Sequence, residues 1–127
     1  MAKTLTYGMV GGGPDAFIGD AHRRAIGLDG TAVIAAGVFS RNREKSLQTA
    51  EELGISTDRC YEDYRAMARA EGEREDGIDF VVVVTPNQSH YEICRAFLEA
   101  GIHVACDKPV TTTYGQAKEL EALAEEK

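Results

Sequence analysis

The sequence predicts an α/β fold in which helices cover both faces of a parallel β-sheet, the arrangement called doubly wound. Two features predict it. Short apolar runs rich in β-branched residues alternate along the chain with longer amphipathic stretches, the pattern of successive β-α-β units. One run contains four consecutive valines, 81–84, and so has no polar face to turn toward water. We expect that strand to lie at the centre of the sheet with helices on both sides.

Length and composition fit a single domain of this kind. The 127 residues are 43% hydrophobic and 28% charged, as in soluble globular proteins. A chain of this size buries about two thirds of its unfolded surface when it folds. We expect residues 1–127 to form one domain around one core, without an internal repeat or a linker.

Five apolar runs are predicted to be strands. The second, "TAVIAAGVF", is as apolar as the valine strand, so it too is expected to be buried on both faces. The predicted strands cover residues 3–10, 31–39, 59–61, 78–85 and 102–106.

Five amphipathic stretches are predicted to be helices. They cover residues 19–29, 42–54, 62–71, 89–100 and 113–127. The fourth carries an apolar stripe at helical spacing, made by Tyr91, Ile93, Cys94, Phe97 and Leu98.

The ends of these helices carry further signals. Ser89 is expected to cap the fourth helix and Gly101 to end it. The segment "EGEREDG", 71–77, is nearly all charge, which indicates a solvated connection. The last helix carries Leu120 and Leu123, which need a partner surface, so we expect the chain to have been cut at this edge.

Charge and cysteine content exclude several classes of function. The formal net charge of −7 repels polyanions, so nucleic acid is not an expected partner. No run of 18 apolar residues and no secretion signal is present, which predicts a cytoplasmic protein without membrane contact. Cys60, Cys94 and Cys106 are widely spaced and form no Cys-x-x-Cys pair, so we predict buried reduced thiols and no metal site.

Three consecutive glycines, Gly11, Gly12 and Gly13, follow the first predicted strand and precede a predicted helix. This is the context of a dinucleotide-binding turn, in which glycines let the backbone approach a pyrophosphate at a helix N-terminus. The run through Ala16 fits G-x-G-x-x-G/A, and a second registration uses Gly11, Gly13 and Gly19 in a longer turn. Both registrations place the pyrophosphate at the same turn. A glycine-rich connection without a ligand is the alternative.

Ser40 directly follows the second predicted strand, at the position where NAD-specific sites usually carry an acidic residue for the ribose hydroxyls. Arg41, Arg43 and Lys45 follow at the start of a helix, where cations oppose the helix dipole. Such a cluster in an acidic protein suggests an anionic partner, and we expect it to meet the 2′-phosphate of NADP. The alternative is a solvated basic patch partly neutralised by Glu44.

Two further polar segments follow the fourth and fifth predicted strands. Pro86 forces the chain out of the sheet after Thr85, and Asn87 then offers a donor and an acceptor. The segment of Asp107 and Lys108 comes directly before Pro109. Taken singly, these are an ordinary turn and an exposed lysine paired with Asp107. Because parallel sheets bind ligands in the crevice outside the carboxyl ends of their strands, we expect all four segments to surround one ligand.

Together these residues resemble the glucose-fructose oxidoreductase, inositol dehydrogenase and rhizopine catabolism (Gfo/Idh/MocA) family over the whole chain. The resemblance is carried by Gly8-x-x-Gly11-x-Gly13, Gly19-x-x-His22, Thr85-Pro86-Asn87-x-x-His90 and Asp107-Lys108-Pro109. It implies a Rossmann domain that binds NAD or NADP, with the arginines favouring NADP, in an oxidoreductase acting on a sugar, cyclitol or other polyol.

The resemblance also assigns residues. It implies that Lys108 is catalytic, beside the nicotinamide ribose and the substrate hydroxyl. The predicted cofactor-binding residues are Gly11, Gly12, Gly13, Phe17, Ile18, Ser40, Arg41, Arg43, Thr85, Pro86, Asn87, His90, Asp107, Lys108 and Pro109. For His90 a packing role at the helix start is the favoured interpretation. This chain departs from the family in two ways, since Asp107 replaces the commoner Glu and the glycine turn is three residues longer.

The family's second domain, which carries the catalytic histidine and the substrate pocket, has no counterpart in these residues. We therefore expect the chain alone to bind cofactor but turn over little or nothing, and the full-length protein to be a homo-oligomer. Two alternatives stay open. One is a dinucleotide-binding regulatory module without catalysis, and the other is a relative that uses tightly held NAD to cleave glycosides.

Overall fold

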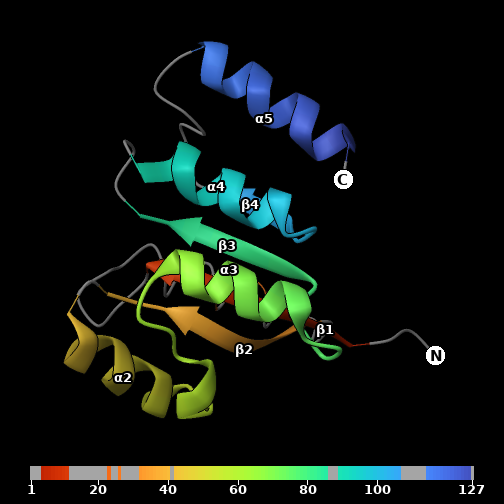
Figure 1. Cartoon of the computed structure of the whole chain (residues 1–127). Helices are drawn as coiled ribbons and strands as arrows, with labels where there is room; N and C mark the ends of the chain where they lie inside the picture. The colour runs from red at the N-terminus through yellow and green to blue at the C-terminus, as the bar shows by residue number, and fades with distance from the viewer. Residues whose placement is uncertain are drawn as a thin grey trace.

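The computed structural model describes residues 4–11, 23, 26, 32–40, 42–85, 89–106 and 114–126. Its centre is a parallel sheet of four strands in the order β2-β1-β3-β4 (Figure 1). The strands are β1 (Leu5–Gly11), β2 (Ala32–Val38), β3 (Phe80–Val84) and β4 (His103–Cys106). Because β1 lies between β2 and β3, the chain reverses its direction across the sheet there, which is a topological switch point.

The helices are α2 (Arg43–Glu52), α3 (Tyr64–Glu73), α4 (His90–Glu99) and α5 (Tyr114–Glu126). In Figure 1, α3 and α4 lie in front of the sheet and α5 lies beside α4. Each predicted helix that falls on described residues is present, with ends shifted by a few residues. Of the helix predicted over 19–29, the structure describes Arg23 and Ile26, and both are helical.

Helices on both faces of the sheet confirm the doubly wound architecture. Val81 and Val83 point into a core that includes Met67, Phe97 and Leu120 of α3, α4 and α5. The alternate valines, 82 and 84, point into a second core with α2 on the opposite face. All four valines are buried, so the position predicted for this strand at the centre of the sheet is correct.

The second predicted strand differs from expectation in its first half. Val33 of β2 is 51% exposed, so β2 is not buried on both faces along its length. The predicted strand at 59–61 is reduced to a single parallel bridge between Gly37 and Cys60. It is preceded by a short 3₁₀-helix, η1 (Thr57–Arg59). Because the bridge covers only the carboxyl half of β2, the amino half remains a partly solvated edge among the described residues.

The ends of α4 are only partly as predicted. Gly101 has a φ of +81° and ends the helix, with its N–H bonded to the Leu98 carbonyl at 3.0 Å and that of Ile102 bonded to the Phe97 carbonyl at 3.0 Å. Ser89 precedes the helix but makes no side-chain capping bond. Its hydroxyl donates instead to Thr85 Oγ1 at 2.7 Å.

One further expectation is wrong, and one leucine of the last helix finds its partner within this chain. The charged segment 71–77 is not a wholly solvated connection, because α3 extends to Glu73 and Glu71 is 2% exposed. Leu120 already has its partner surface within this chain, since it is buried in the core that α4 and α5 share.

Cys60 and Cys94 are buried as predicted, whereas Cys106 is half-buried. A hydrogen bond with Cys106 lowers the pKa of the Cys94 thiol, against the opposing effect of burial. Among the residues that the structure describes, no helix has both the length and the apolar character to cross a bilayer. The same residues contain no group of three or more side chains arranged to hold a metal ion.

Candidate functional site

The carboxyl ends of the four strands lie at one edge of the sheet. Val10 of β1 pairs with Val38 of β2 and Val83 of β3, and Val83 in turn pairs with Cys106 of β4. The segments predicted to bind the ligand all follow these strands directly. Ten of the predicted residues lie outside the described part of the chain: Gly12, Gly13, Phe17, Ile18, Arg41, Pro86, Asn87, Asp107, Lys108 and Pro109.

Gly11 ends β1 in a conformation that favours glycine. Its φ is +94°, in the left-handed region. A Cβ at this position would lie 2.8 Å from the carbonyl oxygen of Val84 and 3.0 Å from its carbonyl carbon. At the switch point, the backbone of β1 therefore bends at Gly11 so close to the end of β3 that no side chain fits at this position.

The end of β2 is held by polar contacts from α2. Ser40 Oγ accepts a hydrogen bond from the Asn42 N–H at 3.1 Å. Asn42 Oδ1 in turn accepts from the Lys45 N–H at 3.2 Å, so Asn42 caps α2. Arg43 is exposed, and its Nη1 donates to the Cys60 carbonyl oxygen at 2.7 Å. A guanidinium has five N–H donors, so the contact with Cys60 orients Arg43 and leaves donors for another acceptor.

Thr85 follows β3 and is fixed by the start of α4. His90 Nε2 lies 2.7 Å from the Thr85 carbonyl oxygen. A carbonyl oxygen only accepts, so Nε2 carries the proton. The His90 ring is 1% exposed, which agrees with the packing role favoured for it at the helix start. With the Ser89 hydroxyl on Thr85 Oγ1, the carbonyl oxygen and the side-chain hydroxyl of Thr85 are both held.

One polar residue near this edge was missed by the sequence interpretation. Ser46 of α2 is 1% exposed, and its Oγ accepts a hydrogen bond from the Phe39 N–H at 3.0 Å. The signal was present, because Ser46 and Ala50 are four residues apart and so share the buried stripe of the helix. A hydroxyl on such a stripe requires a hydrogen-bonding partner.

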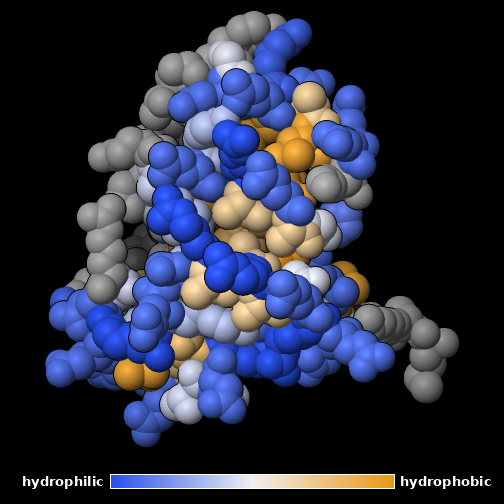
Figure 2. Space-filling view, in the orientation of Figure 1, coloured by the Kyte–Doolittle hydropathy of each residue, from blue (hydrophilic) through white to orange (hydrophobic). Residues whose placement is uncertain are grey.

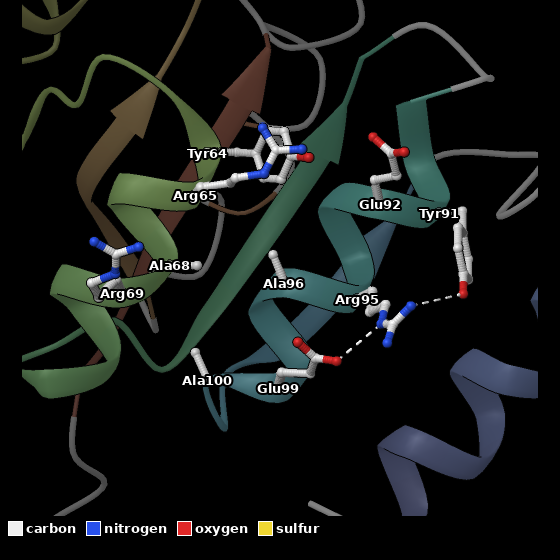
Figure 3. Close-up of a pocket in the computed structure, with 10 residues that line it drawn as sticks. All are labelled: Tyr64, Arg65, Ala68, Arg69, Tyr91, Glu92, Arg95, Ala96, Glu99 and Ala100. Carbon is white, nitrogen blue, oxygen red and sulfur yellow. Dashed lines mark hydrogen bonds and ion pairs between the residues drawn. The ribbon is translucent and has the colours of Figure 1, made fainter.

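A groove of about 550 Å³ lies elsewhere, between α3 and α4 (Figure 3). Its lining includes Ala68, Ala96 and Ala100, with charged and tyrosine side chains around them. Figure 2 shows weakly hydrophobic residues on this face, bordered by hydrophilic ones. Small side chains account for the hollow. The groove is lined by residues of the two helices and not by the strand ends, so we place the candidate site at the carboxyl edge.

Known proteins that are similar to this chain contain the same kind of α/β domain. The sequence model described as "Oxidoreductase family, NAD-binding Rossmann fold" (Gfo/Idh/MocA) matches residues 5–127. The uncharacterized oxidoreductase YfiI of Bacillus subtilis (strain 168) is 43% identical over 128 residues, which cover 100% of this chain and 33% of that protein. D-xylose 1-dehydrogenase (NADP(+)) 2 of Haloferax volcanii is 35% identical over 79 residues, 62% of this chain and 22% of that protein.

A solved structure is also similar. The inositol dehydrogenase homolog from Azotobacter vinelandii, complexed with NAD+, is 40% identical and has a TM-score of 0.95. The match covers 99% of this chain and 32% of that one. The chain thus spans a third or less of these relatives.

Proposed function

The chain belongs to the Gfo/Idh/MocA oxidoreductase family, and from that premise we propose that it is the cofactor-binding part of a polyol or sugar dehydrogenase. Its full-length form would move a hydride between a nicotinamide dinucleotide and a sugar, cyclitol or other polyol. The substrate class is supported by two relatives, one named a D-xylose dehydrogenase and the other an inositol dehydrogenase homolog.

The observation that carries the proposal is the end of β1. Gly11 turns with a φ of +94° at the switch point between β1 and β3. This is where the first glycine of a dinucleotide-binding turn has to bend the chain, and where a pyrophosphate meets backbone N–H groups in such folds. We propose that Gly11, Gly12 and Gly13 approach the pyrophosphate, with Phe17 and Ile18 in the enlarged turn.

The other strand ends are assigned to the two halves of the cofactor. We propose that Ser40, Arg41 and Arg43 bind the adenosine ribose and its 2′-phosphate, which favours NADP over NAD. Thr85, Pro86 and Asn87 would line the nicotinamide half. Asp107 and Pro109 would shape the corner around Lys108. His90 is buried and bonded to Thr85, so we propose that it acts by fixing Thr85 and not by touching the cofactor.

The chemistry is divided between this chain and the rest of the full-length protein. The nicotinamide supplies the hydride acceptor or donor when it is bound. Lys108 would polarise the substrate hydroxyl oxygen, while a histidine from the remaining domain takes the hydroxyl proton. Acid–base assistance of this kind contributes about 10²–10⁴ in rate. We therefore expect residues 1–127 alone to show dehydrogenase activity near background, and robust polyol oxidation by them would contradict this division.

Titration of the 127-residue chain with NADPH and NADH tests the binding site. Both reduced cofactors fluoresce, so their own emission reports binding. We expect wild type to bind and Gly11→Ala to lose about tenfold or more in affinity, because Ala is strained at a positive φ and would meet Val84.

Gly54→Ala is the matched control. Gly54 also has a positive φ, +73°, but a Cβ placed there would have no other atom within 4 Å. The variant should keep wild-type affinity. No binding of either nucleotide by folded wild type would overturn the proposal.

The preference for NADP is tested separately with Arg41→Ala. We expect the variant to weaken binding of NADP more than that of NAD, because only NADP carries the 2′-phosphate. Equal affinity of wild type for both cofactors, unchanged by Arg41→Ala, would remove this part of the proposal.

We also propose that the full-length protein is a cytoplasmic homo-oligomer, which light scattering and localisation in cells would test.

A further inference from the structure

Ser46 connects three parts of the structure at the end of β2. Its side chain is buried on α2, and its Oγ accepts the Phe39 N–H at 3.0 Å. The same Oγ lies 3.4 Å from the Sγ of Cys60, with either atom able to donate. One hydroxyl thus joins α2, the residue that follows β2, and the segment bridged to the outer edge of the sheet.

Cys60 is itself held on two further sides. The residue after it, Tyr61, donates its N–H to the Gly37 carbonyl oxygen at 2.9 Å. Arg43 Nη1 binds the Cys60 carbonyl oxygen at 2.7 Å. The segment that Ser46 contacts is therefore fixed to both β2 and the first turn of α2, so it serves as a rigid support for the hydroxyl.

The bond to Phe39 determines where the next residue lies. β2 ends at Val38, and the N–H of the buried Phe39 is satisfied by Ser46 Oγ. A buried amide left without a partner is strongly unfavourable, so the backbone at Phe39 is tied to α2. Ser40 follows directly, and its Oγ in turn holds the Asn42 N–H.

We propose that Ser46 is a positioning residue for the adenosine half of the cofactor. It is 1% exposed, and it acts through the backbone of Phe39 by fixing Ser40 and the start of α2 in the geometry that receives the adenosine ribose. This inference rests on the proposed function, because it concerns the same cofactor site.

The chain offers a matched control one turn further along α2. Thr49 is also buried, at 3% exposure, but its Oγ1 has no hydrogen-bond partner among the described residues. Ser46→Ala and Thr49→Ala each remove a buried hydroxyl from the same helix. Only the first removes a bond to the end of β2. Any effect of losing a buried hydroxyl in general is therefore common to both variants.

The experiment is calorimetric titration of the 127-residue chain and both variants with 2′,5′-ADP, which carries the adenosine half alone, and with NADP. For Ser46→Ala we expect the dissociation constants of 2′,5′-ADP and of NADP to rise about tenfold, which corresponds to the loss of one buried hydrogen bond. Thr49→Ala should stay within about twofold of wild type. Ser46→Thr, which keeps the hydroxyl, should recover most of the affinity.

Circular dichroism shows whether each variant is folded at the assay temperature. If Ser46→Ala does not fold, Ser46→Cys, with its weaker acceptor, takes its place with the same expected direction. A folded Ser46 variant that binds 2′,5′-ADP as wild type does overturns the positioning role and leaves the proposed function standing. A wild-type chain that binds neither ligand overturns this inference together with the NADP preference, and one that does not bind NAD either overturns the proposed function as well.

Discussion

Glu71 is a buried carboxylate with several hydrogen-bond donors around it. It accepts from Arg59 Nε at 3.0 Å, from Arg59 Nη2, from the Tyr61 hydroxyl at 2.5 Å and from the Ile78 N–H at 3.1 Å. Arg59 also donates to the carbonyl oxygen of Asp76 at 3.3 Å. Glu71 thereby ties the segment around Cys60 to α3 and to the loop that enters β3.

Glu71→Ala is expected to lower the free energy of unfolding by about 3–5 kcal/mol, because it leaves the Arg59 guanidinium and the Ile78 amide without their acceptor. Urea unfolding followed by circular dichroism measures the loss. Glu73→Ala, at an exposed position on the same helix, should change stability by less than about 0.5 kcal/mol. Equal effects of the two substitutions would show that the buried pair contributes nothing specific.

Tyr61 gives this network a dependence on pH. Burial, together with the hydrogen bond to Glu71, raises the pKa of Tyr61 from 10.0 to about 12. Between these values the unfolded chain loses the phenol proton while the folded chain keeps it, so the free energy of unfolding falls as pH rises. Below pH 10.0 both states are protonated, and the stabilisation is fully present.

We expect wild type to lose stability more steeply than Tyr61→Phe as pH rises through this range, since the variant has no phenol proton. At pH 8 the variant should already be less stable by about 1.5–3 kcal/mol, the usual loss for a hydrogen bond to a charged group. Urea unfolding at pH 8, 10 and 11 measures both effects. If the free energy of unfolding fell equally with pH in wild type and in Tyr61→Phe, the pH dependence would not come from Tyr61.

The role of a single residue was predictable from the sequence where the role depends only on backbone conformation. Gly11 and Gly101 both have the positive φ that their positions at a turn and a helix end require. Side-chain partners were not predictable. Glu71 was interpreted as solvated because its neighbours are charged, yet its partner Arg59 lies 12 positions earlier. Ser89 was predicted as a cap from its place before a helix, but Thr85 takes its hydroxyl.

At the scale of elements, α5 packs on the domain through Leu120. This side chain is 6% exposed and lies in the core shared with α4. Tyr91 of α4 also donates a hydrogen bond to Glu119 of α5. The helix α5 therefore packs on this domain as part of its core.

Leu120→Ala is expected to lower the free energy of unfolding by about 2–3 kcal/mol, because it leaves a cavity between α5 and the core. Leu123→Ala, at a half-buried position on the same helix, should lose about 1 kcal/mol or less. Thermal unfolding measures both, and hydrogen exchange should show the amides of α5 opening first in Leu120→Ala. A change at position 120 no larger than that at 123 would contradict this packing.

Elements were predicted well where one pattern dominates. The valines at 81–84 alternate between two cores, as an apolar run without a polar face requires. The run at 31–39 is as apolar, but Val33, near the amino end of β2, is 51% exposed. Neighbours across the sheet decide such differences, and the local sequence does not contain them.

For the whole molecule, the location of the candidate site followed from the sequence. Once all strands are parallel, their carboxyl ends meet at one edge, and the four polar segments had been placed after those ends. What could not be predicted is how the edge is held. The contacts of Ser46 and Arg43 with Cys60 depend on a bridge that brings distant segments together.

The two cores share one sheet, so we expect the chain to unfold in a single cooperative transition. Urea curves followed by far-ultraviolet circular dichroism and by tyrosine fluorescence should coincide, with a slope of about 1–3 kcal/mol/M. Tyr7 lies in one core and Tyr61 packs against the other, so tyrosine fluorescence reports on both sides of the sheet. Two separated transitions would show that the layers fold independently.

The pairing of β1 with β3 also affects how the protein is made. Thr6 and Asp79, at the start of this pair, bond to each other across 73 positions of chain. During translation the first strand emerges long before its neighbour on that side, and closing so long a loop is slow compared with forming a helix. The edge of β1 that faces β3 therefore stays unpaired in the nascent chain until Phe80–Val84 has emerged, and this is the interval in which a chaperone would protect it.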